Sequence, residues 1–168
     1  MRRFLPLAFA LALALPVAAP AQPRSYLATV VHVTDGDTVW VRPSWGGPSI
    51  QVRIQGIDAP ESCQAFGPQA TQALRQRLWR QPVKVEERGR DDYRRTLARL
   101  QWSGQDVGAW LVFSGFAWSY RYRRDPGPYA SLQAQARQAR RGLWSEHQPI
   151  EPARFRKLHG NCEPHERR

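Results

Sequence analysis

The chain has 168 residues, and its 25 Lys and Arg side chains against 14 Asp and Glu give a formal net charge of +11 at pH 7. This length suits one domain that buries its own core, and the sequence contains no internal repeat or low-complexity tract, which excludes a repeat array. A charge of this size favours a polyanionic partner. Nucleic acid is the commonest such partner, and an acidic envelope polymer is the alternative.

The first 21 residues are predicted to be a signal peptide. Two arginines precede an apolar run over residues 4–17, and Ala19-Pro20-Ala21 matches the small-x-small pattern that signal peptidase cuts, here before Gln22. The apolar run is too short to span a bilayer comfortably and no stop-transfer segment follows it, so a membrane anchor is the weaker alternative. We therefore expect an exported protein, periplasmic or extracellular, without a membrane anchor.

Strand signals come first in the predicted domain. Residues 26–33 and 38–42 are apolar runs separated by an Asp-Gly turn, so they are predicted to form a β-hairpin. After a Gly/Pro loop, residues 50–57 are predicted to form a third strand, in which Val52 and Ile54 face one side and Arg53 faces the other. Arg53 is thus expected on the polar face of the sheet, where a phosphate-binding side chain would have to lie.

Helices alternate with strands in the rest of the chain. A proline in the first turn and an apolar stripe predict a helix over residues 67–79, and Asp106 is placed to cap a short apolar helix. Another apolar stripe predicts a last helix over residues 129–143. Two further strands are predicted at residues 83–88 and 96–102.

Five strands with a helix between the third and the fourth follow the order of an OB-type barrel. The predicted fold class is therefore α+β and mainly β, a five-stranded OB-fold barrel with about three helices. We assign residues 22–147 to this domain and residues 148–168 to a C-terminal tail rich in proline and charge.

The chain contains two cysteines, Cys63 and Cys162. In an exported protein an even count favours a disulfide, which here would close a loop of about 100 residues. Two cysteines without a Cys-x-x-Cys spacing form neither a useful metal site nor a redox motif. The bridge would tie the tail to the segment that follows Glu61.

Acidic side chains and arginines recur in three short segments: Asp35-Gly36-Asp37-Thr38, Arg53 through Asp58 to Glu61, and Asp91 to Arg95. Carboxylates can hold a hard cation, a spare carboxylate can accept a proton, and guanidinium groups pair with phosphate. Each segment also has an ordinary explanation, because Asp-Gly is a common hairpin turn and a crowd of charges is usually a solvated loop. Their joint occurrence is what favours metal-assisted phosphodiester cleavage.

With these segments the chain resembles the staphylococcal nuclease family from about residue 28 to residue 144. The resemblance is carried by five ordered blocks: Asp35-Gly36-Asp37-Thr38-Val39, Arg53-Ile54-Gln55-Gly56-Ile57-Asp58-Ala59-Pro60-Glu61, Phe66-Gly67-Pro68-Gln69-Ala70, Asp92-Tyr93-Arg94-Arg95 and Ala139-Arg140-Arg141-Gly142-Leu143-Trp144. It implies an OB barrel with three helices and calcium-dependent hydrolysis of DNA and RNA.

The resemblance also implies a metal site. Asp37 and Asp58 would bind Ca²⁺ together with the backbone carbonyl of Ala59, and Asp35 would support the site from nearby. The chemistry of these groups agrees, because calcium takes hard oxygen ligands in a loose shell that leaves room for water and a phosphate oxygen.

Three further residues receive catalytic roles from the same resemblance. Glu61 would be the general base or the group that positions the attacking water. Arg53 and Arg95 would bind the scissile phosphate, and Arg95 would also assist the leaving oxygen. Two guanidinium groups and a cation can together neutralise the charge that develops on the phosphorus centre.

Aromatic side chains near these arginines are candidates for substrate binding. Tyr93 lies two residues before Arg95, and Tyr120 and Tyr122 flank Arg121 in a basic segment. Aromatic faces interleaved with arginine suit base stacking beside phosphate pairing. Packing within the fold, or a solvated loop, is the alternative for all of them.

We expect a monomer that acts on DNA or RNA. The competing class is a catalytically weak OB-fold module that binds nucleic acid, because OB barrels bind single strands routinely. A third class is an exported structural or adhesive domain whose charge serves envelope attachment. The presence together of Asp37, Arg53, Asp58, Glu61 and Arg95 favours the enzyme.

Overall fold

The computed structural model describes residues 24–160 and Cys162. The predicted signal peptide, residues 1–21, lies outside the described residues. Within them, no helix is long and apolar enough to cross a membrane.

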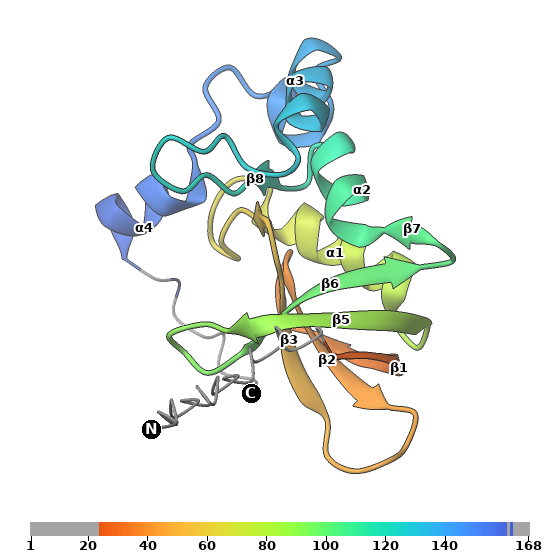
Figure 1. Cartoon of the computed structure of the whole chain (residues 1–168). Helices are drawn as coiled ribbons and strands as arrows, with labels where there is room; N and C mark the ends of the chain where they lie inside the picture. The colour runs from red at the N-terminus through yellow and green to blue at the C-terminus, as the bar shows by residue number, and fades with distance from the viewer. Residues whose placement is uncertain (1–23, 161, 163–168) are drawn as a thin grey trace, which may run out of the picture.

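Five strands form a closed mixed barrel, as predicted (Figure 1). The strand β1 is antiparallel to β2 on one side and to β5 on the other, β2 is antiparallel to β3, and β5 is antiparallel to β6. The barrel closes because β3 runs parallel to β6. The strands are β1 (Ser25–Val33), β2 (Thr38–Pro43), β3 (Ile50–Ile54), β5 (Pro82–Arg90) and β6 (Thr96–Trp102).

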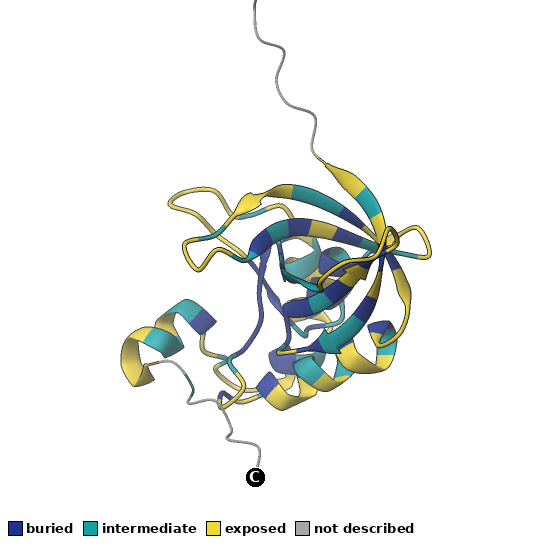
Figure 2. Cartoon of the chain, turned by 90° about the horizontal axis from the view of Figure 1, so that it is seen from below, coloured by how far each residue is buried: buried dark blue, intermediate teal, exposed yellow. Residues whose placement is uncertain are grey.

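The barrel interior is filled by aliphatic side chains that alternate along the strands. Val39 and Val41 of β2 and Val52 and Ile54 of β3 are fully or almost fully buried (Figure 2). Burial of each such side chain contributes about 1.5–3 kcal/mol to folding. Arg53, between Val52 and Ile54, faces away from this core, which is the orientation that the alternation predicted.

Two short strands form a separate sheet that carries Asp58, and a third extends the main sheet. The strand β4 (Ile57–Asp58) pairs with β8 (Trp118–Ser119), so that Asp58 lies opposite Trp118. The strand β7 (Gln105–Asp106) pairs with the end of β6. The predicted third strand, residues 50–57, is therefore interrupted, because Gly56 turns with a φ of 82° between β3 and β4.

Two predicted helices are confirmed. Helix α1 (Gly67–Leu78) has proline in its first turn and buries Ala70, Leu74 and Leu78 against the barrel. Helix α2 (Val107–Phe113) is capped as expected, because the Asp106 side chain accepts a hydrogen bond of 2.9 Å from the backbone N–H of Ala109.

The predicted last helix, residues 129–143, is shorter than expected. Helix α3 (Ala130–Gln138) is followed by a separate 3₁₀ turn, η1 (Gly142–Ser145). Arg140 and Gly142 adopt positive φ angles of 49° and 52°, which end the helix. A Cβ at Gly142 would collide with the carbonyl oxygen of Gly115, so this turn is packed tightly against the end of α2.

A fourth helix, α4 (Pro152–His159), lies in the predicted tail and corrects the expectation of about three helices. It lies at the side of the molecule, and half of its residues are exposed (Figures 1 and 2). Pro152 is its one buried residue, so it lacks the apolar stripe by which the other helices are recognised.

Helix α4 is held in place by contacts on both sides of it. The predicted disulfide between Cys63 and Cys162 is present, with the two Cα atoms 5.7 Å apart. The Gln64 side chain donates a 2.6 Å hydrogen bond to the carbonyl of Ile150, and Arg121 forms a 3.0 Å ion pair with Glu151. These contacts replace the missing apolar stripe and fix the helix against the loop that follows β4.

Candidate active site

A cavity of about 540 Å³ opens at one side of the barrel. Every residue predicted to bind metal or to act in catalysis lines it: Asp35, Asp37, Arg53, Asp58, Ala59, Glu61 and Arg95. These residues come from the β1–β2 turn, from β3, from β4 with the loop after it, and from the loop between β5 and β6. The fold thus brings the three segments of the sequence into one site.

The β1–β2 turn is shaped by hydrogen bonds and by a close approach at Gly36. The backbone N–H of Asp37 donates to the Asp35 side chain at 3.0 Å. A Cβ at Gly36 would lie 2.7 Å from the Cβ of Ala59 and 2.9 Å from that of Ala70. Glycine is therefore required for this turn to reach the loop that carries Ala59.

Asp37 is only 6% exposed, and both of its carboxylate oxygens accept hydrogen bonds. Oδ1 accepts from the Thr38 hydroxyl at 3.1 Å, and Oδ2 accepts from the backbone N–H of Ala59 at 2.8 Å. Oδ2 also forms a 2.6 Å ion pair with Nη1 of Arg53. The carboxylate is thus fixed in position by three different segments of the chain.

Asp58 is also buried and shares the Arg53 guanidinium with Asp37. Its Oδ1 lies 3.0 Å from Nη2 of Arg53. Arg156, which was not predicted as a site residue, donates from Nη1 to Oδ1 at 3.3 Å and from Nη2 to Oδ2 at 3.1 Å. Both oxygens of Asp58 therefore face guanidinium groups.

The clustered carboxylates perturb one another. Burial, together with the nearby Asp37 carboxylate, raises the pKa of Asp35 to about 7. Burial also raises the pKa of Asp58, although its hydrogen bond from Arg156 acts in the opposite direction. The carboxyl groups thus lie in an environment where added positive charge is favourable.

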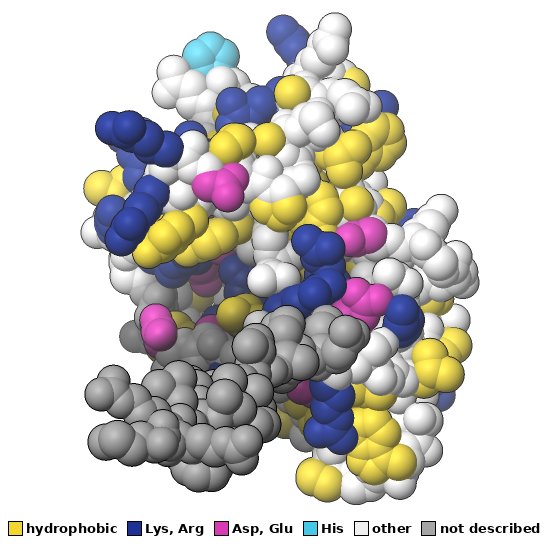
Figure 3. All heavy atoms as spheres, in the orientation of Figure 1, with side chains coloured by type: hydrophobic (Ala, Val, Ile, Leu, Met, Phe, Trp, Pro, Cys, Tyr) yellow, Lys and Arg dark blue, Asp and Glu magenta, His cyan; other side chains and the backbone are white. Residues whose placement is uncertain are grey.

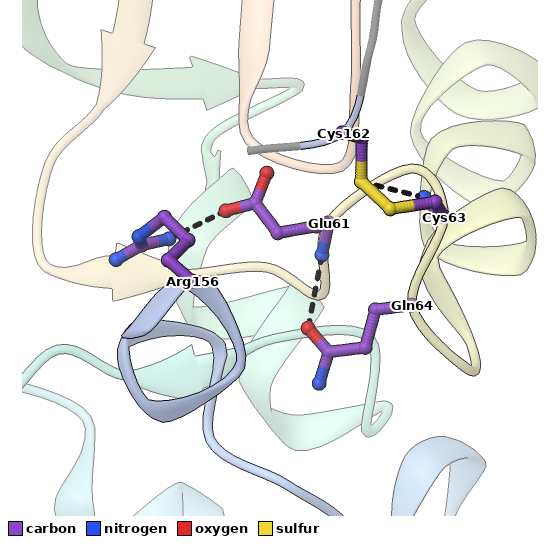
Figure 4. Close-up of a disulfide and its surroundings, with 5 residues drawn as sticks. All are labelled: Glu61, Cys63, Gln64, Arg156 and Cys162. Atoms are coloured by element: carbon purple, nitrogen blue, oxygen red, sulfur yellow. Dashed lines mark hydrogen bonds and ion pairs between the residues drawn. A yellow bond between two sulfur atoms is a disulfide. The ribbon is translucent and has the colours of Figure 1, made fainter. Parts of the chain in front are cut away.

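Glu61 lies in a tight turn between β4 and α1 (Figure 4). Its backbone N–H donates to the Gln64 side chain at 3.2 Å, and its carbonyl accepts from the backbone N–H of Gln64 at 2.9 Å. A Cβ at Gly67 would collide with the Glu61 carbonyl, so α1 begins directly against this turn. The Glu61 carboxylate points toward Arg156, and Nη1 of Arg156 lies 2.6 Å from its Oε1.

Arg156 comes from α4, nearly 100 positions along the chain from its partners. Although burial opposes its charge, hydrogen bonds to Asp58 and Glu61 raise the pKa of its guanidinium. Sequence reasoning missed this residue because it is one of several basic residues in the tail. The disulfide expected between Cys63 and Cys162 was the one available signal that the tail returns to the site.

Arg95 is held by the loop that carries it. Its Nε lies 2.6 Å from Oδ2 of Asp91, and Oδ1 of Asp91 accepts from the backbone N–H groups of Arg95 and Tyr93. Its Nη1 is 3.5 Å from the Thr38 hydroxyl, and its Cζ lies 5.4 Å from the centre of the Tyr93 ring. Asp91 and Thr38 are thus supporting residues to which sequence reasoning gave no role.

A second cavity of about 460 Å³ adjoins the first and shares Arg53, Tyr93 and Arg95 with it. Tyr120 and Tyr122 line it too, and both are exposed, at 46% and 61%. The three predicted tyrosines thus surround one cavity and lie outside the core. Arg121, predicted beside them, is instead paired with Glu151 at the start of α4.

The oxygen donors suit a hard cation, although their present partners are guanidinium groups. Among residues 24–160 and Cys162, no three His, Cys, Asp or Glu side chains are already grouped as a metal site. Arg53 and Arg156 stand in as the cations on Asp37 and Asp58. Two aspartates in one cavity with Ala59, whose backbone N–H bonds Asp37, offer the hard oxygen ligands that calcium accepts.

Comparison with known proteins places the chain among nucleases. Residues 51–146 match the family described as "Staphylococcal nuclease homologue". A micrococcal nuclease of Shigella flexneri is 39% identical over 92% of this chain and 94% of its own length. An uncharacterized endonuclease of Haemophilus influenzae is 38% identical over 76% of this chain and 71% of its own, and protein ParB of Escherichia coli is 36% identical over 95% and 96%. Together with the barrel and the grouped site residues, these matches show that the chain belongs to the staphylococcal nuclease family.

Proposed function

We propose that the chain is a calcium-dependent phosphodiesterase that hydrolyses DNA, RNA or both. The observation that carries this proposal is that Asp37, Asp58 and Glu61 line the same cavity as Arg53 and Arg95. A domain that only bound nucleic acid would need the arginines but not three carboxylates, which repel a phosphate.

Asp37 and Asp58 would hold the Ca²⁺ ion with the carbonyl of Ala59, and Asp35 would add negative charge from nearby. When bound, calcium would supply Lewis-acid stabilisation of the negative charge that develops on the phosphate oxygens. Thr38 and the Ala59 backbone hold the Asp37 carboxylate by hydrogen bonds. The side chain would therefore need little change of orientation to bind the ion.

The arginines and Glu61 would carry out the remaining steps. Arg53 and Arg95 would pair with the non-bridging oxygens of the scissile phosphate, where their planar forks match the geometry of the anion. Glu61 would accept the proton of the attacking water as the oxygen approaches phosphorus. Arg95 would also stabilise the oxygen that leaves.

Tyr93, Tyr120 and Tyr122 would stack on the bases next to the scissile phosphate. They border the cavity that adjoins the site, and exposed aromatic faces bind bases of any sequence. Basic side chains are spread over the face shown in Figure 3, with acidic side chains between them, which suits a polyanionic substrate.

We further propose that the chain is exported and acts as a monomer without a membrane anchor. The disulfide between Cys63 and Cys162 supports export, because such bonds persist in oxidising compartments. In this arrangement residues 1–21 are the signal peptide and residues 22–147 the nuclease domain, while residues 148–168 are a tail tied back to it.

Purified chain should cleave plasmid, single-stranded DNA or RNA when calcium is present and should stop when a chelator is added. The measurement is the initial rate on each substrate, with the chelator reversed by excess calcium as control. Binding of an oligonucleotide without any cleavage would leave the catalytically weak binding module as the function.

Salt dependence should report whether Arg121 contacts the substrate. On a log–log plot of single-strand affinity against salt concentration, replacing Arg121 with Gln should make the slope less steep by about 0.7. This is the contribution of one phosphate contact to the slope. Affinity would be measured by fluorescence anisotropy in chelator, with the exposed Arg42→Gln as the matched control. An unchanged slope would mean that Arg121 serves only its ion pair with Glu151.

A further inference from the structure

Within residues 24–160, Arg156 is the side chain that hydrogen-bonds the Glu61 carboxylate. The turn around Glu61 is fixed through its backbone by Gln64 and Gly67, but those contacts leave the carboxylate itself free to rotate. The 2.6 Å contact with Nη1 of Arg156 is what orients it (Figure 4). A base must be held at a defined angle to the water it deprotonates, so this contact bears on the reaction.

The same guanidinium is bound to Asp58. One nitrogen, Nη1, bridges Glu61 and Asp58, while Nη2 bonds the other oxygen of Asp58. Arg156 thus sets the position of Glu61 relative to Asp58, one proposed to accept a proton and the other to hold the cation. A single planar fork that joins two carboxylates fixes their separation more tightly than two separate ion pairs would.

The placement of Arg156 depends on links outside the barrel. Helix α4 buries only Pro152, so its own packing does not fix it. The Cys63–Cys162 bridge joins the chain beyond α4 to a residue two positions after Glu61. Gln64, one position further, holds the carbonyl of Ile150 just before the helix. The turn that carries Glu61 and the helix that carries Arg156 are therefore clamped together at both ends of the helix.

Charge in the cavity gives Arg156 a second effect. Asp35, Asp37, Asp58 and Glu61 line the cavity. Arg53 and Arg156 are the guanidinium groups paired with these carboxylates, whereas Arg95 is paired with Asp91 outside that group. A guanidinium beside Asp58 weakens the attraction of the site for a cation while strengthening its attraction for a phosphate. Removal of Arg156 should therefore tighten calcium binding even though it slows the reaction.

We propose that Arg156 is a positioning residue of the nuclease site, which orients Glu61 against Asp58 and which the Cys63–Cys162 disulfide holds in place. This inference rests on the proposed function. It makes full activity depend on the oxidised chain, because the bridge is the covalent link among the contacts that hold α4 against the Glu61 turn.

Arg156→Gln should lower kcat by about 10–100-fold at saturating calcium, the range found when a residue that orients a site group is lost. KM should change less than kcat. Calcium binding to the same variant without substrate, measured by isothermal titration calorimetry, should be tighter by roughly three- to tenfold. Arg156→Lys, which keeps the charge but not the fork, should recover part of kcat.

Arg154→Gln is the matched control, because Arg154 lies on the same helix and is exposed. It should leave kcat and calcium affinity at the parent values. The double variant Cys63→Ser, Cys162→Ser should also have a lower kcat. Adding Arg156→Gln to this double variant should lower kcat by a smaller factor than in the parent, because both changes disrupt the same contact between Arg156 and Glu61. Thermal unfolding of every variant checks that the barrel is intact.

If Arg156 were purely structural, Arg156→Gln would lower calcium affinity, kcat and thermal stability together. If Arg156 blocked the site, Arg156→Gln would raise both calcium affinity and kcat. Either result overturns the inference. An Arg156→Gln variant whose kcat equals that of the Arg154→Gln control overturns it as well. A parent that cleaves no substrate would refute the proposed function itself. An active parent with an unaffected Arg156→Gln variant would refute only the role of Arg156.

Discussion

Glu61→Gln should lower turnover by roughly 10²–10⁴-fold, the contribution expected of a positioned general base. The substitution keeps the size and shape of the side chain but removes the charge that can accept a proton. Calcium and oligonucleotide binding should persist, because Asp37 and Asp58 hold the proposed metal and the arginines hold the phosphate. The measurement is the single-turnover rate at saturating calcium, with both bindings followed separately.

Glu146→Gln is the control for this change, since Glu146 is exposed in the loop after η1 and lies outside the cavity that holds Glu61. It should cleave at the parent rate. A Glu61→Gln variant within a few-fold of the parent would assign proton transfer to another group and would leave Glu61 as a partner of Arg156 alone.

Arg95→Ala should lower kcat by roughly 10²–10³-fold, the loss seen when one donor to a developing oxyanion is removed. Excess calcium should not restore the rate, because the lost fork acts on charge that appears only as the phosphate reacts. Asp91 fixes Nε of Arg95 at 2.6 Å, so the guanidinium is already oriented before the substrate binds. Initial rates over a range of calcium and substrate concentrations give the effects on kcat and KM separately.

Arg90→Ala tests whether a general loss of charge would have the same effect. Arg90 is exposed at the end of β5, just before the loop that carries Arg95. It should change binding slightly and kcat not at all. A loss in Arg95→Ala that appears only in KM would make Arg95 a substrate-binding residue without a role in the chemical step.

The barrel was predictable because its signals are local, whereas the candidate site residues came from the resemblance to the staphylococcal nuclease family. Asp-Gly turns, alternation around Arg53 and a proline at the start of α1 each act within a few residues. The end of α3 was misplaced, since the left-handed backbone at Arg140 depends on how the next turn packs against Gly115. Local pattern cannot report such a contact.

Arg156 was beyond prediction for a related reason. Its helix is short, buries one residue and is held by a disulfide and two polar contacts to distant segments. The sequence around it is a charged, proline-containing tail in which no arginine is distinguished from its neighbours. The disulfide predicted the return of the tail but not which side chain would enter the site.

Whether Asp37 and Asp58 hold the cation that activates the chain can be decided by one measurement, in which calcium binding and cleavage rate are titrated side by side for the parent and Asp37→Asn. The proposed site predicts that the parent's rate rises with the same midpoint as its calcium binding. It also predicts that both midpoints move together to higher calcium in Asp37→Asn, so that excess calcium restores part of the rate. Parent cleavage that persists in chelator, or midpoints that Asp37→Asn leaves unchanged, would contradict a metal site at these carboxylates.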